Sequence, residues 1–246
     1  MSRILGIIPA RYQSLRFPGK VLVDIHGKSM VQRVYQQAEK AAGITKVVVA
    51  TDDTRIFNHV KQLGGHVCMT NTNHPSGTDR CFEALELEDG SYDFVINIQG
   101  DEPFIDPRQI EELINSLTSE VEIATQAKHI ESQSKLNDVN CVKVVIGKHD
   151  NAIYFSRSAL PFLRNVPDDQ WVTKFNYYQH IGIYAYRADI LKEITSLPQS
   201  PLEKAERLEQ LRWLENGYTI KVCITEHQAH GIDTPEDLEK VLAIIS

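Results

Sequence analysis

The 246-residue sequence has few cysteines, and they form no paired motif. Cys68, Cys81, Cys141 and Cys223 are widely spaced, and no two of them make a CxxC pair. Three of the four lie in apolar runs that are typical of strands or helices. We therefore expect buried thiols, and not a cysteine-based site.

The sequence also has no long apolar segment. The apolar stretch in the N-terminal MSRILGIIPAR is too short for a signal peptide, and charged residues follow it at once. No segment reaches the roughly 20 apolar residues that a membrane-spanning helix needs. We expect a cytoplasmic protein that has no membrane partner.

An excess of positive charge is absent too. The 26 Lys and Arg residues are outnumbered by 33 Asp and Glu residues, which gives a formal net charge of −7. Because binding to nucleic acid depends on neutralising phosphates with Lys and Arg, we expect no nucleic-acid partner. A protein of this charge that binds an anion must concentrate its cations locally, so clusters of Arg and Lys are informative.

The first half alternates short apolar runs with helical patterns. Strand-like runs occupy residues 4–8, 47–50, 66–70 and 94–98. Helical periodicity lies between and after them, at residues 28–42, around 56–63, and at 80–87 and 107–117. Strands that alternate with helices of this length favour right-handed crossovers. The pattern predicts an α/β fold with a mainly parallel sheet and helices on both faces.

The second half is less regular. Strand-like runs at 121–127, 142–146, 153–155 and 182–186 do not have a helix between every pair, which indicates a small antiparallel portion. An amphipathic helix at 202–215, a strand at 219–224 and a closing helix at 235–245 follow. We find no internal repeat or long linker. We therefore expect a single domain over residues 1–246, with the irregular portion roughly within 120–200.

The connection after the first strand carries three cations, Arg11, Arg16 and Lys20, together with Gly19. In a parallel sheet, ligands bind beyond the carboxyl ends of the strands, where this loop lies. Its cations and backbone amides are suited to hold a polyphosphate. The loop is neither GxGxxG nor GxxxxGK[ST], so the usual dinucleotide and P-loop motifs are absent. The alternative is a solvated basic loop.

Two aspartates are candidates for binding a hard cation. Asp101 follows a strand and a glycine in QGDEP, where a carboxylate can face a cleft and bind Mg²⁺ together with substrate phosphates. Its alternative role is that of a turn carboxylate. Asp233 in GIDTPED supplies a second acid. However, Asp233 or Thr234 can equally cap the helix that begins at Pro235, and the sequence does not decide between capping and metal binding.

The ordered motifs IPARYQSLRFPGK, ATDD, SGTDR, INIQGDEP, FSR, HIGIYAYR, LEQLRWLENG and IDTPEDL extend from about residue 4 to residue 240. This set resembles the family of 3-deoxy-manno-octulosonate cytidylyltransferases, also called CMP-Kdo synthetases. PARYxSxRxPGK and QGDEP are shared with other cytidylyltransferases, whereas the combination of SGTDR, HIGIYAYR, LEQLR and IDTPEDL is more specific. The resemblance implies a Rossmann-like fold of the nucleotide-diphospho-sugar transferase type.

The resemblance also implies the activity. Such enzymes transfer CMP from CTP to the anomeric hydroxyl of the acidic sugar Kdo, which gives CMP-Kdo and pyrophosphate and activates Kdo for lipopolysaccharide synthesis. They are Mg²⁺-dependent, and we expect a homodimer. A cytidylyltransferase for amino-Kdo or sialic acid is the nearest alternative. A regulatory nucleotide-binding protein without turnover is another, and the missing GxGxxG disfavours a dehydrogenase.

By resemblance, the nucleotide side of the site falls in three motifs. Arg11 and Lys20 contact the phosphates as catalytic residues, with Ser14 and Arg16 in the same loop. Asp101 and Asp233 hold the catalytic Mg²⁺. The SGTDR segment encloses the cytidine, although its hydroxyls can instead cap the following helix, or do both; its residues are Ser76, Gly77 and Thr78.

The sugar side is also implied by the resemblance. Arg157 and Arg164 are candidates for the Kdo carboxylate or hydroxyls, because Arg binds carboxylates bidentately. Further hydrogen bonds to hydroxyls are assigned to Gln99, His180, Tyr184 and Glu209. Without the resemblance, His180 would be a packed or surface histidine and Glu209 a solvent-facing helix residue.

Overall fold

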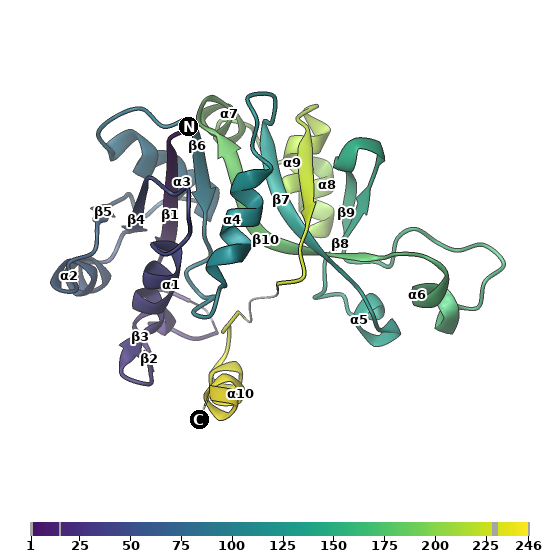
Figure 1. Ribbon diagram of the computed structural model, residues 1–246, viewed down its shortest axis with the longest axis horizontal. Helices are drawn as coiled ribbons and strands as arrows, with labels where there is room; N and C mark the ends of the chain where they lie inside the picture. Colours follow the sequence, from purple (N-terminus) through teal and green to yellow (C-terminus); the bar gives the residue numbers. More distant parts are fainter. Residues whose placement is uncertain (1, 15, 228–230, 246) are drawn as a thin grey trace. The chain divides into compact units, whose positions relative to one another are not determined.

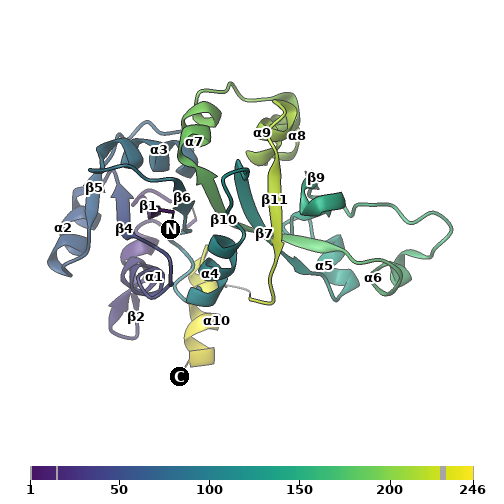
Figure 2. The ribbon, with the colours of Figure 1, turned by 45° about the horizontal axis from the view of Figure 1, so that its top comes forward.

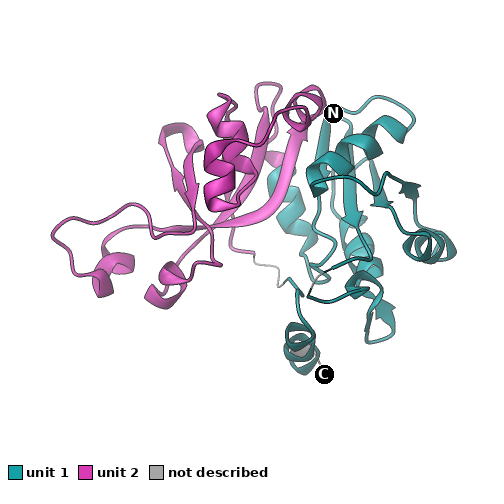
Figure 3. Ribbon diagram, turned by 180° about the vertical axis from the view of Figure 1, so that it is seen from behind, with its two compact units in different colours: residues 1–114, 229–246 teal, residues 115–228 magenta. Residues whose placement is uncertain are grey.

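The structure is a computed structural model that describes residues 2–14, 16–227 and 231–245. The chain divides into two units (Figure 3). Residues 1–114 and 229–246 form unit 1, and residues 115–228 form unit 2. The irregular portion that the sequence places at 120–200 therefore lies within unit 2.

Unit 1 is built on four parallel strands. They are β1 (Ile4–Ala10), β4 (Lys46–Thr51), β5 (Val67–Met69) and β6 (Phe94–Asn97). Strand β1 pairs in parallel with β4 on one side and β6 on the other, and β5 adds to β4. Strand β1 is buried along almost its whole length, which explains its continuous apolar run. The predicted parallel sheet is confirmed.

Helices alternate with these strands. They are α1 (Met30–Ala38), α2 (Thr54–Gln62), α3 (Gly77–Leu87) and α4 (Pro107–Asn115). The chain steps outward from β1 to β4 and β5, and then returns across the sheet to β6. Right-handed crossovers therefore place α3 on the face opposite α1. Figure 2 shows α1 and α3 on opposite sides of β1.

Helix α1 is shorter than the predicted 28–42. It begins at Met30 because Ser29 is its N-cap and accepts a hydrogen bond from the Gln32 amide at 3.2 Å. It ends at Ala38, five residues before Gly43. The predicted apolar face is nevertheless buried: Met30, Val31, Val34, Tyr35, Ala38 and Ala41.

The C-terminal helix α10 (Pro235–Ile245) belongs to unit 1 and has the predicted bounds (Figure 1). Its Val241 packs in a core cluster with Ile25 and Met30, which come from the start of the chain. Ile25 lies on the small hairpin of β2 (Asp24–Ile25) and β3 (Lys28–Ser29). The residues just before α10 are thereby fixed in unit 1.

Unit 2 contains the predicted antiparallel portion. Strand β7 (Ile123–His129) pairs antiparallel with β10 (Tyr178–Arg187) and parallel with β11 (Ile220–Ile224). Strand β8 (Lys143–Ile146) pairs antiparallel with β10 and with β9 (Ala152–Ser156). Strand β10 is twice as long as the run at 182–186 that the sequence indicated.

The prediction of one continuous helix over residues 202–215 is wrong. The structure has two helices, α8 (Pro201–Glu206) and α9 (Gln210–Glu215), separated by Arg207 in a left-handed conformation. A buried ion pair joins Glu203 to Arg212 across this break, with Nη2 to Oε1 at 2.6 Å and Nε to Oε2 at 2.8 Å. Nine residues along a straight helix span about 13 Å and end on the opposite face. The pair therefore requires the break.

Several shorter helices had no clear sequence signal: α7 (Ala188–Thr195), α5 (Gln133–Asn137), α6 (Trp171–Lys174) and the 3₁₀ turns η1 (Lys20–Leu22), η2 (Lys148–Asp150) and η3 (Asp168–Gln170). All four cysteines are free thiols, and only Cys81 and Cys141 are fully buried. No helix in the described ranges is both long and apolar enough to span a bilayer.

Candidate active site

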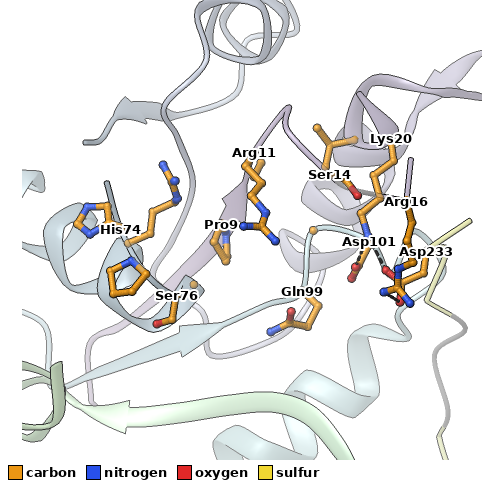
Figure 4. A pocket seen from close by; sticks show the side chains of 16 residues that line it. Pro9, Arg11, Ser14, Arg16, Lys20, His74, Ser76, Gln99, Asp101 and Asp233 are labelled. Carbon is orange, nitrogen blue, oxygen red and sulfur yellow. Dashed lines mark hydrogen bonds and ion pairs between the residues drawn. The ribbon is translucent and has the colours of Figure 1, made fainter. Parts of the chain in front are cut away.

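A pocket of about 380 Å³ lies in unit 1, at the carboxyl ends of β1 and β6 (Figure 4). Strand β4 flanks β1 on one side and β6 flanks it on the other, so the chain leaves β1 and β6 in opposite directions. Ligands of open α/β sheets bind at such a switch point. Ser76, Gly77 and Arg80, at the start of α3, also line the pocket.

The structure brings most of the predicted nucleotide residues together. Thr78 is the exception, because it is buried in the first turn of α3 and does not line the pocket. Gln99, predicted for the sugar, faces the same pocket. The predicted residues that line it are Arg11, Ser14, Arg16, Lys20, Ser76, Gly77, Gln99, Asp101 and Asp233.

The loop after β1 owes its shape to Gly19. This glycine adopts a left-handed conformation with φ of 74°, and its amide donates to the Tyr12 carbonyl at 2.8 Å. This hydrogen bond joins the two ends of the loop. Arg11 and Lys20, which flank the two bonded residues, consequently face one pocket.

Lys20 joins the two predicted metal ligands. Its Nζ donates to Asp101 Oδ2 at 2.7 Å and to Asp233 Oδ1 at 2.9 Å. Burial alone would lower the pKa of Lys20, but the two carboxylates outweigh it and raise the pKa above its ordinary value. The Lys20 side chain is 12% exposed, so water screens these contacts only partly. Figure 4 shows this cluster at one end of the pocket.

The structure separates the two candidates for capping α10. Thr234 Oγ1 accepts from the Asp237 amide at 3.2 Å, and Asp237 Oδ2 accepts from the Thr234 amide at 3.1 Å. Thr234 is therefore the cap. The Asp233 carboxylate instead pairs with Lys20 and with Arg16 Nη2, which lies 2.8 Å away.

Backbone contacts fix the two acids relative to each other. The Ile232 amide donates to the Asp101 carbonyl at 2.9 Å. Ile232 is fully buried in the cluster that holds α10. The position of the C-terminal segment thus determines where the Asp233 carboxylate meets Asp101.

This donor set fits a magnesium ion. One oxygen of Asp101 and one of Asp233 already converge on a single cationic centre, the Lys20 ammonium. Mg²⁺ accepts such a pair of hard carboxylate oxygens and completes its shell with waters and phosphates. Among the described residues no cluster of three or more His, Cys, Asp and Glu offers a complete protein cage. The remaining ligands would come from substrate and water.

Glu102, the neighbour of Asp101, does not line the pocket. Its carboxyl is buried, and burial, with a smaller effect from Asp101, raises the pKa of Glu102 to about 7. Asp101 is therefore the acid of QGDEP that presents a charge to the pocket.

Ser76 has both of the roles that the sequence suggested for its segment. Its hydroxyl caps α3 by accepting from the amides of Thr78 at 3.1 Å and Asp79 at 3.2 Å. It also lines the pocket. The capping interaction therefore fixes the orientation of a pocket residue.

Sequence reasoning missed further pocket residues, above all Arg80 and His74. Arg80 is 5% exposed and donates to Thr70 Oγ1 at 2.6 Å and to Asp52 Oδ2 at 2.9 Å. His74 is bound to Glu83 through its Nε2. Arg80 and Asp52 occur in the motifs SGTDR and ATDD, but their pairing across 28 positions has no signal in the sequence.

The other predicted sugar residues lie in unit 2. The Arg157 guanidinium donates to the backbone carbonyls of Glu206 at 2.8 Å and Val139 at 3.1 Å, so it is held in place. Arg164 is exposed in an irregular segment. These two residues share no common partner that would place them in one cluster.

His180, Tyr184 and Glu209 do form a cluster. The His180 ring lies 5.3 Å from the Tyr184 ring, and its Nε2 is 3.0 Å from Thr125 Oγ1. Burial lowers the pKa of His180 to about 3, so the ring is neutral at physiological pH. Burial and then the charge of Glu209 raise the pKa of Tyr184 well above its ordinary value.

The tautomer of His180 follows from its partner. The Thr125 hydroxyl donates its one proton to a backbone carbonyl, with Ile183 O at 2.8 Å. Its oxygen must then accept from the Nε2–H of His180. The Nδ1 of the ring consequently has a lone pair that can accept a hydrogen bond.

Comparison with known proteins agrees with this geometry. The model of the cytidylyltransferase family matches residues 5–222, and the chain belongs to that family. It is 53% identical to the 3-deoxy-manno-octulosonate cytidylyltransferase of Parabacteroides distasonis, over 100% of this chain and 99% of that protein. The enzyme of Cytophaga hutchinsonii is also 53% identical, over 97% and 96%. Within the family, the chain is thus a member of the 3-deoxy-manno-octulosonate cytidylyltransferases.

A solved structure supports the same assignment. It is described as CMP:2-keto-3-deoxy-manno-octonic acid synthetase complexed with CTP. It has 42% identity and a TM-score of 0.92, and the match covers 99% of this chain and 98% of that one. The fold and the family predicted from sequence are confirmed.

Proposed function

We propose that this chain transfers CMP from CTP to the anomeric hydroxyl of Kdo in a Mg²⁺-dependent reaction, and so activates Kdo for lipopolysaccharide synthesis. The identity of 53% to two 3-deoxy-manno-octulosonate cytidylyltransferases, over nearly the full length of each protein, supports CTP and Kdo as the substrates. The observation that carries the mechanism is the pocket of unit 1, which four arginine and lysine side chains and two carboxylates line. A triphosphate with a bound cation has the complementary charges.

The pocket favours catalysis by positioning and charge stabilisation. The Kdo hydroxyl attacks the α-phosphorus in line, and pyrophosphate leaves. No protein nucleophile is required for such a transfer. Arg11 and Lys20 bind the phosphates, with Ser14 and Arg16 beside them, and they stabilise the charge that develops on the leaving pyrophosphate.

Asp101 and Asp233 would hold the magnesium ion. When bound, the ion supplies charge neutralisation at the phosphates and lowers the pKa of the sugar hydroxyl. Lys20 currently neutralises both carboxylates, so its ammonium must be released from them to meet a phosphate.

Residues of unit 2 support recognition of the sugar acid. The neutral His180 accepts a hydrogen bond from a sugar hydroxyl at Nδ1, and Tyr184 and Glu209 lie beside it. The Arg157 guanidinium has further N–H groups besides the two that bind carbonyls, and these are suited to the Kdo carboxylate. Arg164 contributes from its exposed position.

The protein acts as a cytoplasmic homodimer in this proposal. Among the described residues of unit 2, six large apolar side chains are exposed, from 37% for Leu202 to 72% for Phe162; the others are Val139, Ile153, Phe175 and Ile224. Exposed apolar side chains that gather in one part of a chain are typical of a protein interface. A monomer in sedimentation at micromolar concentration would contradict the dimer.

The test of the function is a pyrophosphate-release assay with CTP, Mg²⁺ and a panel of Kdo, amino-Kdo and sialic acid. We expect turnover with Kdo that disappears without the divalent ion. Arg11→Ala should weaken the use of CTP by about 2–4 kcal/mol in transition-state stabilisation, with little change in melting temperature. Equal turnover with sialic acid and none with Kdo would contradict the substrate assignment.

A further inference from the structure

The ATDD segment at the end of β4 has no role in the reaction so far. Its two acids do not line the pocket, yet each is bound to an arginine. Asp52 binds Arg80, which lines the pocket and is almost fully buried. The buried Arg80 therefore holds the end of β4 in place.

Asp53 holds Arg55 by two side-chain hydrogen bonds. Arg55 Nε lies 2.9 Å from Oδ1, and Nη2 lies 2.6 Å from Oδ2. The same carboxylate caps α2 by accepting from the Arg55 amide at 2.9 Å. Hydrogen bonds from Arg55 lower the pKa of Asp53, so the acid remains charged. This geometry fixes the plane of the guanidinium.

The fixed guanidinium stacks on Tyr12. Arg55 Cζ lies only 3.3 Å from the centre of the Tyr12 ring, which is a cation–π contact. The Tyr12 ring in turn lies against Gly19. A Cβ atom at Gly19 would come within 3.0 Å of the ring carbon Cζ and of the hydroxyl oxygen of Tyr12.

These contacts form one continuous series, Asp53–Arg55–Tyr12–Gly19. The series ends on the loop after β1, residues 11–20, which we call the phosphate loop. Tyr12 and Gly19 are the residues whose backbone hydrogen bond closes that loop, and Arg11 and Lys20 flank them. We propose that Asp53, Arg55 and Tyr12 are positioning residues, which hold the loop in the shape that presents Arg11 and Lys20 to the triphosphate. The inference rests on the proposed use of CTP.

Charge repulsion within the phosphate loop is the reason that it needs these positioning contacts. Arg11, Arg16 and Lys20 are three like charges within ten residues, and they repel one another, although Asp101 and Asp233 offset part of the charge of Lys20 and Arg16. A loop that relaxed outward would lower this repulsion and would have to be reordered when CTP binds. This reordering would use part of the binding free energy and so would weaken CTP binding.

The test compares CTP binding, by calorimetry, and CTP kinetics in three variants. Tyr12→Ala removes the ring. Arg55→Met removes the stack at a side chain that is 57% exposed, so this variant folds even if the first does not. Asp53→Asn keeps the helix cap, because Asn caps as well as Asp, but it removes the charge that orients Arg55. Tyr12→Phe keeps the ring and should behave like the wild type.

Arg108→Met is the matched control. Arg108 makes the same contacts with Asp106 at the start of α4, from its amide at 2.9 Å and its Nη2 at 2.5 Å, but it does not touch the phosphate loop. We expect Arg55→Met and Asp53→Asn to raise the Kd and KM for CTP at least tenfold, with kcat at saturating CTP and the KM for Kdo within about twofold of wild type. Arg108→Met should change neither.

The outcomes separate failure of the positioning role from failure of the proposed function. If the wild type binds CTP and the folded Arg55→Met and Asp53→Asn variants bind it equally well, the positioning role is overturned while the proposed function stands. If Arg108→Met weakens CTP binding as much as Arg55→Met, the effect is general stability and the inference also fails. If the wild type binds no CTP, both the inference and the proposed function fail.

Discussion

Lys20 and Asp101 lie 81 positions apart in the sequence, and their side chains meet at 2.7 Å. Lys20 reaches Asp233 in the same way, from 213 positions away. The lysine that we assign to the phosphates is thus paired with both proposed metal ligands. A divalent ion bound as we propose would compete with Lys20 for the same two carboxylates.

This competition predicts an unusual effect of removing a cation. Lys20→Met should increase the affinity of the nucleotide-free protein for Mn²⁺, used as a paramagnetic substitute for Mg²⁺. The ion no longer has to displace an ammonium from two carboxylate oxygens. We expect a gain of roughly tenfold, or about 1.4 kcal/mol, measured by titration with electron paramagnetic resonance, although the same variant should use CTP poorly.

The control for this experiment is Arg16→Met. Arg16 also pairs with Asp233, at 2.8 Å, but its side chain is 66% exposed and water screens the pair. We expect its Mn²⁺ affinity to stay within about threefold of wild type. Equal Mn²⁺ binding by the wild type and Lys20→Met would show that Lys20 does not compete with the ion.

A second prediction concerns the buried pair that spans the break between α8 and α9. Glu203 and Arg212 side chains are 8% and 7% exposed, so removing the Glu203 charge takes away the close partner of a buried guanidinium and leaves it with Glu209 at 3.9 Å. Glu203→Gln should reduce the free energy of unfolding by about 3–5 kcal/mol. Asp150→Asn, which breaks the exposed pair with Lys221, should cost less than about 1 kcal/mol. Denaturant unfolding of both variants measures the difference, and equal losses would contradict it.

A third prediction follows from His180. Its pKa is about 3 in the folded chain, below the ordinary value of 6.5, so the neutral ring contributes stability above pH 6.5 that is lost as the pH falls. The loss should be about 1 kcal/mol between pH 6.5 and 5. His180→Gln should have a correspondingly flatter stability profile over this range. Identical profiles in urea unfolding would mean that His180 titrates normally.

The regular parts of this fold were predictable because their causes are local. Strand β1 is a continuous apolar run, and α10 begins at Pro235 and carries its own cap, so both elements agree with their sequence signals. The break at Arg207 was not predictable, because it accompanies a tertiary contact, the ion pair between Glu203 and Arg212. A pair of that kind depends on tertiary structure and leaves the helical periodicity intact.

The site shows the same division. Arg11 and Asp101 were identified from their positions after strands, and both line the pocket. The pairing of Lys20 with Asp101 and Asp233 was not predicted, although both acids were named as candidates, because the three segments are far apart in the sequence. Arg80 was likewise missed as a pocket residue, because Asp52 positions it through a long-range contact.

The last prediction concerns Asp233 and its neighbour Thr234, between which the sequence could not assign the cap of α10. The structure gives the cap to Thr234 and directs the Asp233 carboxylate to Lys20 and Arg16. The two functions should therefore separate between two adjacent variants. Thr234→Ala should lower the free energy of unfolding by about 1 kcal/mol through the lost cap, and kcat should remain near normal.

Asp233→Asn should have the opposite profile. It removes a full charge from a site for a hard cation, so kcat should fall at least about a hundredfold, or roughly 3 kcal/mol. Its melting temperature without metal should change little, because the carboxylate is 45% exposed and does not cap the helix. Asp101→Asn should behave alike, and the double variant should lose little more than either single one, since both acids serve one ion. Near-normal turnover of Asp233→Asn at saturating Mg²⁺ would leave Asp101 and the substrate phosphates as the only ligands of the ion.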